Sequence, residues 1–113
     1  MAKRKKVSFV FDKERIEVTA RECGFFSFGL MFRTKKTEPC VFEFGEPTNF
    51  RISSLFVGFP FVAIWFDEKN KIIDAKKVEP FTLSVSPRRK YHTLLEIPIN
   101  QKYSKIVQNF GFQ

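Results

Sequence analysis

Residues that could perform catalysis are few in this chain, and they form no known motif. The single histidine is His92, and the cysteines are Cys23 and Cys40. Glu96 shares a strand face with His92, but roughly 13 Å separates Cα atoms four residues apart in a strand, too far for a direct hydrogen bond. The sequence has no glycine-rich phosphate loop, no metal-binding spacing and no paired carboxylates. We therefore expect no enzyme, no catalytic residue, no metal and no cofactor.

The two cysteines, Cys23 and Cys40, have neither a metal-binding nor a redox-active spacing. Cysteines in proteins of reducing compartments are usually free thiols. The opening MAKRKK is followed by an apolar run that is too short and too polar for a signal peptide. We expect two free thiols in or near the core of a cytoplasmic protein, with no export signal, no membrane anchor and no membrane partner.

The chain is strongly basic, with a net charge of +8 and a pI of about 9.7. This charge attracts anions but does not identify them, and 28% charged residues are also typical of thermophilic surfaces. Phenylalanines beside basic turns could stack on bases, so RNA or single-stranded nucleic acid is one candidate partner. The alternative is that these lysines and arginines only solvate turns and protect sheet edges. The basic residues in or beside expected turns are Lys35, Lys36, Lys76, Lys77, Arg88, Arg89 and Lys90.

The elements that must position these residues are organised around residues 55–67, LFVGFPFVAIWFD, the most apolar stretch of the chain. It is too short and too broken to span a bilayer, and it indicates buried strand. Gly58 and Pro60 predict a break within it. With 113 residues, 43% of them hydrophobic, and 16 phenylalanines, the chain can form one compact domain without a disulfide or metal.

Alternating apolar and polar residues predict further strands on both sides of this stretch. Residues 7–11 and 16–20 suit an antiparallel hairpin with a turn at Asp12-Lys13. The preceding basic residues 1–6 are predicted to be a frayed end, and contact with phosphate is the alternative. Turn residues at 67–71, with Asn70 in a left-handed conformation, precede a returning strand at 72–78, and another strand is expected at 91–97.

A helix is predicted near residues 20–32. Thr19 and Glu22 have the spacing of a capping box, and apolar residues follow at helical intervals. The tail from Tyr103 to Phe112 suits either a closing strand or a short helix. The expected fold is therefore a mostly β, single small domain over residues 1–113: a twisted antiparallel sheet or partly closed β-barrel with one short α-helix.

The segment Gly29-Leu30-Met31-Phe32-Arg33 is similar to the GLM-x-R motif of a conserved family known as domain of unknown function 192. Further segments resemble the family in the same order: residues 41–44, 50–55, 59–62 and 63–67, then Pro80 and the strand from Tyr91 to Pro98 with Glu96. The likeness covers residues 18–112. It implies a fold and no established activity.

The chain departs from the family at polar positions that a ligand pocket would use. The family's Trp, Lys, Asn and Thr are replaced by Arg51, Ser53, Ser54 and Leu55, and its aspartate after Ile-Pro-Leu is Val62. Its Gly-Asp turn near the C-terminus corresponds to Gln108-Asn109.

The site expected near the motif centres on Arg33, since a guanidinium suits bidentate contact with a carboxylate or other anion. The candidate ligand contacts are Arg33, Met31, Arg51 and Asp67. In the alternative, Arg33 caps the preceding helix and pairs with a carboxylate such as Asp67 or Glu43. The expected function is a small binding or interaction module whose partner is a small anion or a protein; nucleic-acid binding is the alternative, and the oligomeric state is left open.

Overall fold

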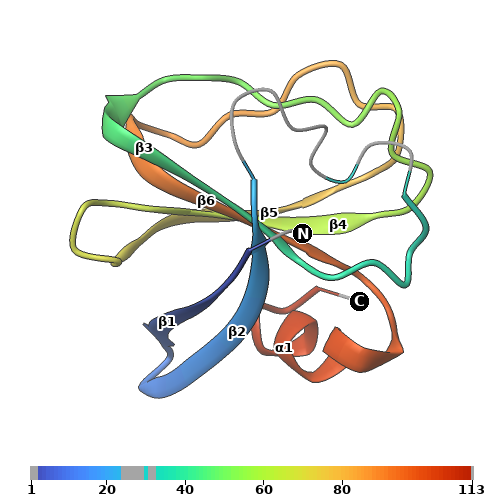
Figure 1. Cartoon of the computed structure of the whole chain (residues 1–113), viewed down its shortest axis with the longest axis horizontal. Coiled ribbons are helices and arrows are strands. Elements are labelled where there is room, and N and C mark those ends of the chain that lie inside the picture. Colours follow the sequence, from blue (N-terminus) through green and yellow to red (C-terminus); the bar gives the residue numbers. More distant parts are fainter. Residues whose placement is uncertain (1–2, 24–29, 31–32, 113) are drawn as a thin grey trace.

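The structure, a computed structural model, describes residues 3–23, 30 and 33–112. Within these residues a mixed six-stranded sheet forms most of the fold, and a short helix follows the last strand (Figure 1). The strand order is β1-β2-β3-β6-β4-β5, with β2 and β3 parallel and the other neighbours antiparallel. The elements are β1 (Arg4–Phe11), β2 (Glu14–Glu22), β3 (Cys40–Thr48), β4 (Phe61–Phe66), β5 (Ile72–Val78), β6 (Tyr91–Pro98), the 3-10 turn η1 (Gln101–Tyr103) and α1 (Ser104–Asn109).

The edge strands β1 and β5 approach each other, with Cα atoms within 8 Å, so the sheet curls into a half-barrel. This confirms the predicted β-rich single domain with a partly closed sheet, and the described short helix lies at Ser104–Asn109. The parallel β2–β3 pair is a departure from a purely antiparallel sheet.

The apolar residues form two cores, one on each face of the sheet. All six side chains of β4 are buried and alternate between the faces. Trp65 belongs to the core under the long connections, which lie above the sheet in Figure 1, and Phe66 belongs to the core that the β1–β2 hairpin and α1 cover. The predicted break at Gly58–Pro60 is confirmed. The expectation of buried strand fails at Leu55 and Phe56, which lie exposed in a turn before it.

Both hairpin turns predicted from the sequence are confirmed. Asp12 and Lys13 have φ of 50° and 67°, and Asn70 has φ of 61°. Asp and Asn tolerate this left-handed conformation, which closes tight turns between antiparallel strands. The frayed N-terminal end is wrong for residues 4–6, because they pair with residues 19–21 of β2.

The predicted start of a helix near residue 20 is also wrong. Thr19, Ala20 and Glu22 lie in β2, where pairing with β1 and burial of alternate side chains outweigh the local capping signal. Residues 24–29 and 31–32 of the predicted helix are outside the described residues. A described helix, α1, lies in the tail, where Val107 is buried and the ring of Phe110 stacks on that of Phe11.

Candidate functional site

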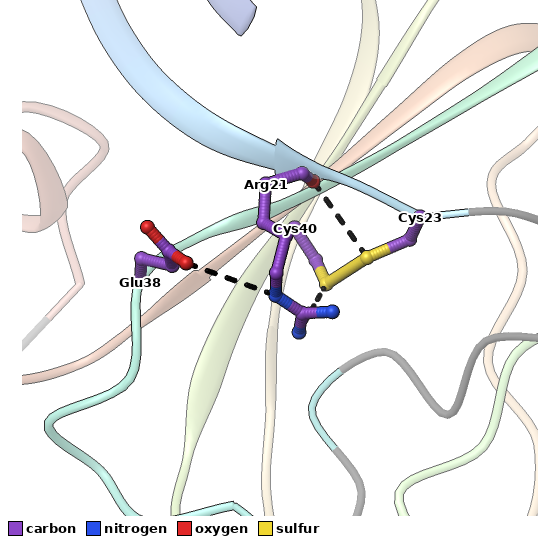
Figure 2. Close-up of a disulfide and its surroundings, with 4 residues drawn as sticks. All are labelled: Arg21, Cys23, Glu38 and Cys40. Carbon is purple, nitrogen blue, oxygen red and sulfur yellow. Dashed lines mark hydrogen bonds and ion pairs between the residues drawn. A yellow bond between two sulfur atoms is a disulfide. The ribbon is translucent and has the colours of Figure 1, made fainter. Parts of the chain in front are cut away.

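A disulfide between Cys23 and Cys40 joins the end of β2 to the start of β3 (Figure 2). The Cα atoms are 6.1 Å apart, and both residues are buried. The expectation of two free thiols is therefore wrong. The cysteines are 17 residues apart in the sequence and meet because β2 and β3 run parallel, with Arg21 opposite Cys40. Their spacing alone could not reveal this register.

Arg21 places a buried guanidinium against the disulfide (Figure 2). Its Nη2 lies 3.1 Å from Sγ of Cys40, and its carbonyl oxygen lies 3.6 Å from Sγ of Cys23. Disulfide sulfurs carry no proton, so Arg21 is the donor in the first contact and the second is a close approach. The disulfide thus forms one wall around this guanidinium.

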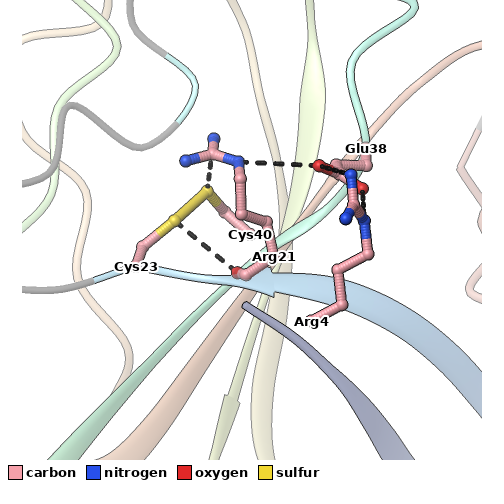
Figure 3. Close-up of polar contacts among 5 residues, drawn as sticks. All are labelled: Arg4, Arg21, Cys23, Glu38 and Cys40. Carbon is pink, nitrogen blue, oxygen red and sulfur yellow. Dashed lines mark hydrogen bonds and ion pairs between the residues drawn. A yellow bond between two sulfur atoms is a disulfide. The ribbon is translucent and has the colours of Figure 1, made fainter. Parts of the chain in front are cut away.

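Glu38 lies between two guanidinium groups (Figure 3). Arg4 donates to its carboxylate through Nε at 2.7 Å and Nη2 at 3.1 Å, a bidentate pair. On the other side, Nε of Arg21 is 3.9 Å from Oε1 of the same carboxylate. Glu38 therefore links β1 to β2 through their arginines. We call the arginines gathered here the guanidinium cluster, and Glu38 is a carboxylate that this cluster already binds.

Arg33 adds a third guanidinium charge. Burial lowers the pKa of Arg21, and the positive charge of Arg33 is the next largest cause of that lowering. Arg33 itself is exposed. In the part of the chain that the structure describes, no carboxylate lies within ion-pair distance of Arg33. The predicted pairing with Glu43 is not formed, since Glu43 pairs with Lys5.

Glu96 faces the same cluster from β6. It is the antiparallel partner of Cys40 on β3 and of Ala63 on β4. Burial raises the pKa of Glu96 to about 8, and the charge of Arg21 opposes this shift only in part. The carboxyl is therefore mostly protonated at pH 7. Among the described side chains, Arg4 and Arg21 then lie against the ionised carboxylate of Glu38, and the charge of Arg33 adds to that of Arg21.

The structure does not bring the four predicted ligand contacts together. The charge of Arg33 lowers the pKa of Arg21, and Met31 is outside the described residues. Arg51 is exposed on a different loop, where its Nε donates to Oγ of Ser84. The roles of these residues as ligand contacts stay predictions.

Asp67 closes the β4–β5 turn. Its Oδ1 accepts hydrogen bonds from the N–H groups of Lys71 at 3.0 Å and Lys69 at 2.9 Å, and the Lys71 bond is the main cause of its lowered pKa. Asp67 is four residues beyond Ala63, the partner of Glu96, so roughly 13 Å of strand separates it from the level of the cluster. Asp67 thus has a local structural role and does not pair with Arg33.

The predicted basic residues fall into two groups. Lys76, Lys77 and Arg88 interact with the protein itself, through the carbonyl of Ser86, the carboxylate of Glu79 and the carbonyl of Ile73. The others border shallow grooves: Lys35 and Lys36 line one of about 500 Å³ with residues 99–102, and Arg89 and Lys90 line one of about 380 Å³ beside Asp67.

Sequence reasoning missed Arg21, Glu38 and the charge state of Glu96. A signal did exist for Glu96, because an acidic residue between Leu95 and Ile97 in an apolar strand is seldom buried without a reason. No local signal marked Arg21, whose burial depends on the parallel pairing of β2 with β3.

The described residues contain no group of three or more potential metal ligands. His92 is half-buried, and its Nδ1 lies 3.5 Å from Oγ1 of Thr93. Among the described elements, no helix is long and apolar enough to cross a membrane.

Two solved structures share this fold. One is a proposed transcription regulator from Sinorhizobium meliloti 1021, with 16% sequence identity, a TM-score of 0.80, and coverage of 99% of this chain and 89% of the other. The second is a protein of unknown function from Novosphingobium aromaticivorans DSM 12444, with 15% identity, a TM-score of 0.76, and coverage of 91% and 78%. No family model and no curated protein matches the sequence. At these identities the likeness shows the fold alone.

Proposed function

We propose that this chain is a binding module without catalytic chemistry, and that it binds a small anion, preferentially a carboxylate, at the guanidinium cluster of Arg21 and Arg33. The gathering of guanidinium groups carries this proposal. Arg4 and Arg21 lie against Glu38, the charge of Arg33 acts on Arg21, and burial keeps the neighbouring Glu96 protonated near pH 7. Such a cluster favours an additional negative charge.

The two arginines have different parts in this proposal. Arg33 is exposed and supplies the contact that reaches solvent, while Arg21 supplies a buried positive charge beneath it. A guanidinium offers parallel N–H donors that match the two oxygens of a carboxylate. Arg4 and Glu38 form a bidentate arginine–carboxylate contact of this kind within the protein.

Isothermal titration calorimetry of the full chain with acetate, citrate and phosphate at low salt tests this proposal. We expect saturable binding, and Arg33→Ala should weaken it at least tenfold because a hydrogen bond to a charged group is worth about 1.5–3 kcal/mol. The free energy of unfolding should change by less than about 1 kcal/mol, since Arg33 is exposed.

Arg15→Ala is the matched control. Arg15 is also exposed and lies on β2, but six residues, or roughly 20 Å of strand, separate it from Arg21. Its affinity should equal that of the wild type. Absence of saturable binding by all three anions, or equal weakening in both variants, would refute the proposal. A stability loss well above 1 kcal/mol in Arg33→Ala would assign Arg33 a structural role instead.

Membership of the family that carries the GLM-x-R motif, the cytoplasmic location and the absence of a membrane partner stay predictions. The nucleic-acid alternative also stays a proposal. Lys76, Lys77 and Arg88 each make a contact within the protein, so a nucleic-acid surface would have to include residues beside these basic turns.

A further inference from the structure

The connection before β4 and the connection after β5 pair with each other as a short antiparallel ribbon. This loop ribbon comprises residues 50–57 and 79–86. Ile52 and Val85 exchange both backbone hydrogen bonds, at 2.9 and 2.8 Å. Ile52 and Val57 are buried in the core above the sheet, so the ribbon is fixed to the rest of the molecule.

Ser54 holds the second strand of the loop ribbon in place. Its buried Oγ donates to the carbonyl of Glu79 at 2.6 Å and accepts from the N–H of Thr82 at 2.7 Å. Its carbonyl accepts from the N–H of Phe81 at 2.8 Å. Phe81 has φ of 63°, a left-handed conformation that is costly for a bulky residue. Such strain persists only where the surroundings impose it, and it is concentrated at functional sites.

The loop ribbon presents large apolar side chains to solvent. The exposed fractions are 76% for Leu83, 67% for Phe81, 57% for Phe56 and 39% for Leu55. Leu55 and Phe56 form the turn that the Val57 N–H closes on the carbonyl of Ser54, which also binds Phe81. The backbones of the Leu55–Phe56 turn and of Phe81 therefore meet at one carbonyl, and Leu83 lies two residues beyond Phe81. Large apolar side chains exposed in one segment mark a candidate interaction site.

Cationic side chains lie along the loop ribbon. Each contacts one of its residues: Arg51 contacts Ser84, Lys76 the carbonyl of Ser86 and Lys77 the carboxylate of Glu79. Three positive charges and one negative charge thus lie along the ribbon, which complements an anionic partner.

We propose that the loop ribbon binds single-stranded nucleic acid, with Phe81 stacking on a base and Arg51 and Lys76 contacting phosphates. Single strands are bound by aromatic side chains that stack on unpaired bases next to cations that follow the backbone. The bases of a duplex are already stacked on each other and are not available to Phe81. This surface does not depend on the guanidinium cluster and does not require the anion proposal.

An anionic membrane surface would also attract apolar and basic residues, but the arrangement favours nucleic acid. Interfacial proteins insert apolar side chains below the headgroups and leave the cations at headgroup level. Here the cations are held beside the apolar residues by bonds to the same ribbon. A strand with alternating bases and phosphates suits this arrangement.

Fluorescence anisotropy of the full chain with a short labelled thymidine oligonucleotide across a salt series tests the proposal. Phe81→Ala should weaken binding at least about fivefold, the lower end of the effect of losing one stacked base. Arg51→Ala should reduce the slope of log affinity against log salt by about 0.7, the contribution of one phosphate contact to a single strand. A duplex of the same sequence should compete poorly.

Several controls keep the result interpretable. Val10→Ala removes an apolar side chain that is 63% exposed on β1, away from the loop ribbon, and should bind as the wild type does. Arg33→Ala should also bind the oligonucleotide normally, which separates this proposal from the anion site. Circular dichroism melting checks each variant, and Leu83→Ala replaces Phe81→Ala if the latter does not fold.

Three outcomes would overturn the proposal. The first is no oligonucleotide binding at low salt. The second is binding that is insensitive to Phe81→Ala and Leu83→Ala but lost in Lys35→Ala, which would place the strand in the groove beside η1. The third is cosedimentation with phosphatidylglycerol vesicles, dependent on Phe81, without oligonucleotide binding; this would assign the loop ribbon to a membrane surface.

Discussion

At the scale of single residues, the charge of the candidate site depends on Glu96. Its cross-strand partners, Cys40 and Ala63, are fully buried, so ionisation would place a charge in apolar surroundings. Arg21 offsets this cost only in part, and the pKa stays near 8. A neutral Glu96 does not offset the positive charge of Arg21.

The raised pKa of Glu96 predicts a pH-dependent stability. Between pH 4.5 and about 8 the carboxyl is protonated in the folded chain and ionised in the unfolded chain, so unfolding releases a proton. The free energy of unfolding should therefore fall as pH rises through this window, by up to about 1.4 kcal/mol per pH unit, and level off above it for this group.

Urea unfolding of the wild type and Glu96→Gln at several pH values between 5 and 9 measures this contribution. Glutamine matches the size and polarity of the protonated side chain and cannot ionise. The variant should lack the negative slope, so the two curves diverge as pH rises. Parallel curves would show that Glu96 does not change its protonation on unfolding.

Residue-scale prediction from the sequence had a clear limit. Arg33 could be singled out because it belongs to a short motif that is visible in the sequence, and its charge contributes to the lowered pKa of Arg21. Arg21 could not be singled out. Ile16, Val18 and Ala20 show which face of β2 covers a core, but Arg21 lies on the other face, and no local pattern shows that this face is also covered.

At the scale of elements, the hairpins were predictable because their signals are local. Alternation in β1, β2 and β5 and the turn residues Asp12 and Asn70 are sufficient to define strand, turn and return. The predicted start of the helix was wrong. A capping box is a local signal, and pairing of β2 with β1 outweighs it at residues 19–21. The β2–β3 pair and the disulfide are non-local and leave no periodic signal.

The disulfide predicts a specific contribution of these elements to stability. Cys23 and Cys40 close a loop with a sequence separation of 17 residues, and a cross-link over a loop of this length stabilises a fold by about 3 kcal/mol. The double variant Cys23→Ala/Cys40→Ala should lose about that much free energy of unfolding, measured in urea without reductant.

Reduction of the wild type with dithiothreitol is the matching measurement. It should lower the stability of the wild type to near that of the double variant and should leave the double variant unchanged. An equally stable double variant, or a wild type whose stability does not respond to reductant, would show that the bond contributes nothing to the fold.

At the scale of the whole molecule, the two faces of the half-barrel are covered differently. The β1–β2 hairpin and α1 cover the core on one face, while long connections cover the core on the other (Figure 1). Loops on a fixed scaffold are the usual place for binding residues. The whole-molecule charge of +8 then favours anionic partners at either surface.

The most direct test of the central claim observes the guanidinium groups themselves. Nitrogen-15 NMR of the arginine Nε–H signals during a citrate titration at pH 6.5 and low salt reports each side chain separately. The signals of Arg21 and Arg33 should shift together and saturate with one dissociation constant, while that of Arg15 stays in place. Equal, unsaturable shifts of all three arginines, or no shift at Arg33, would contradict an anion site at this cluster.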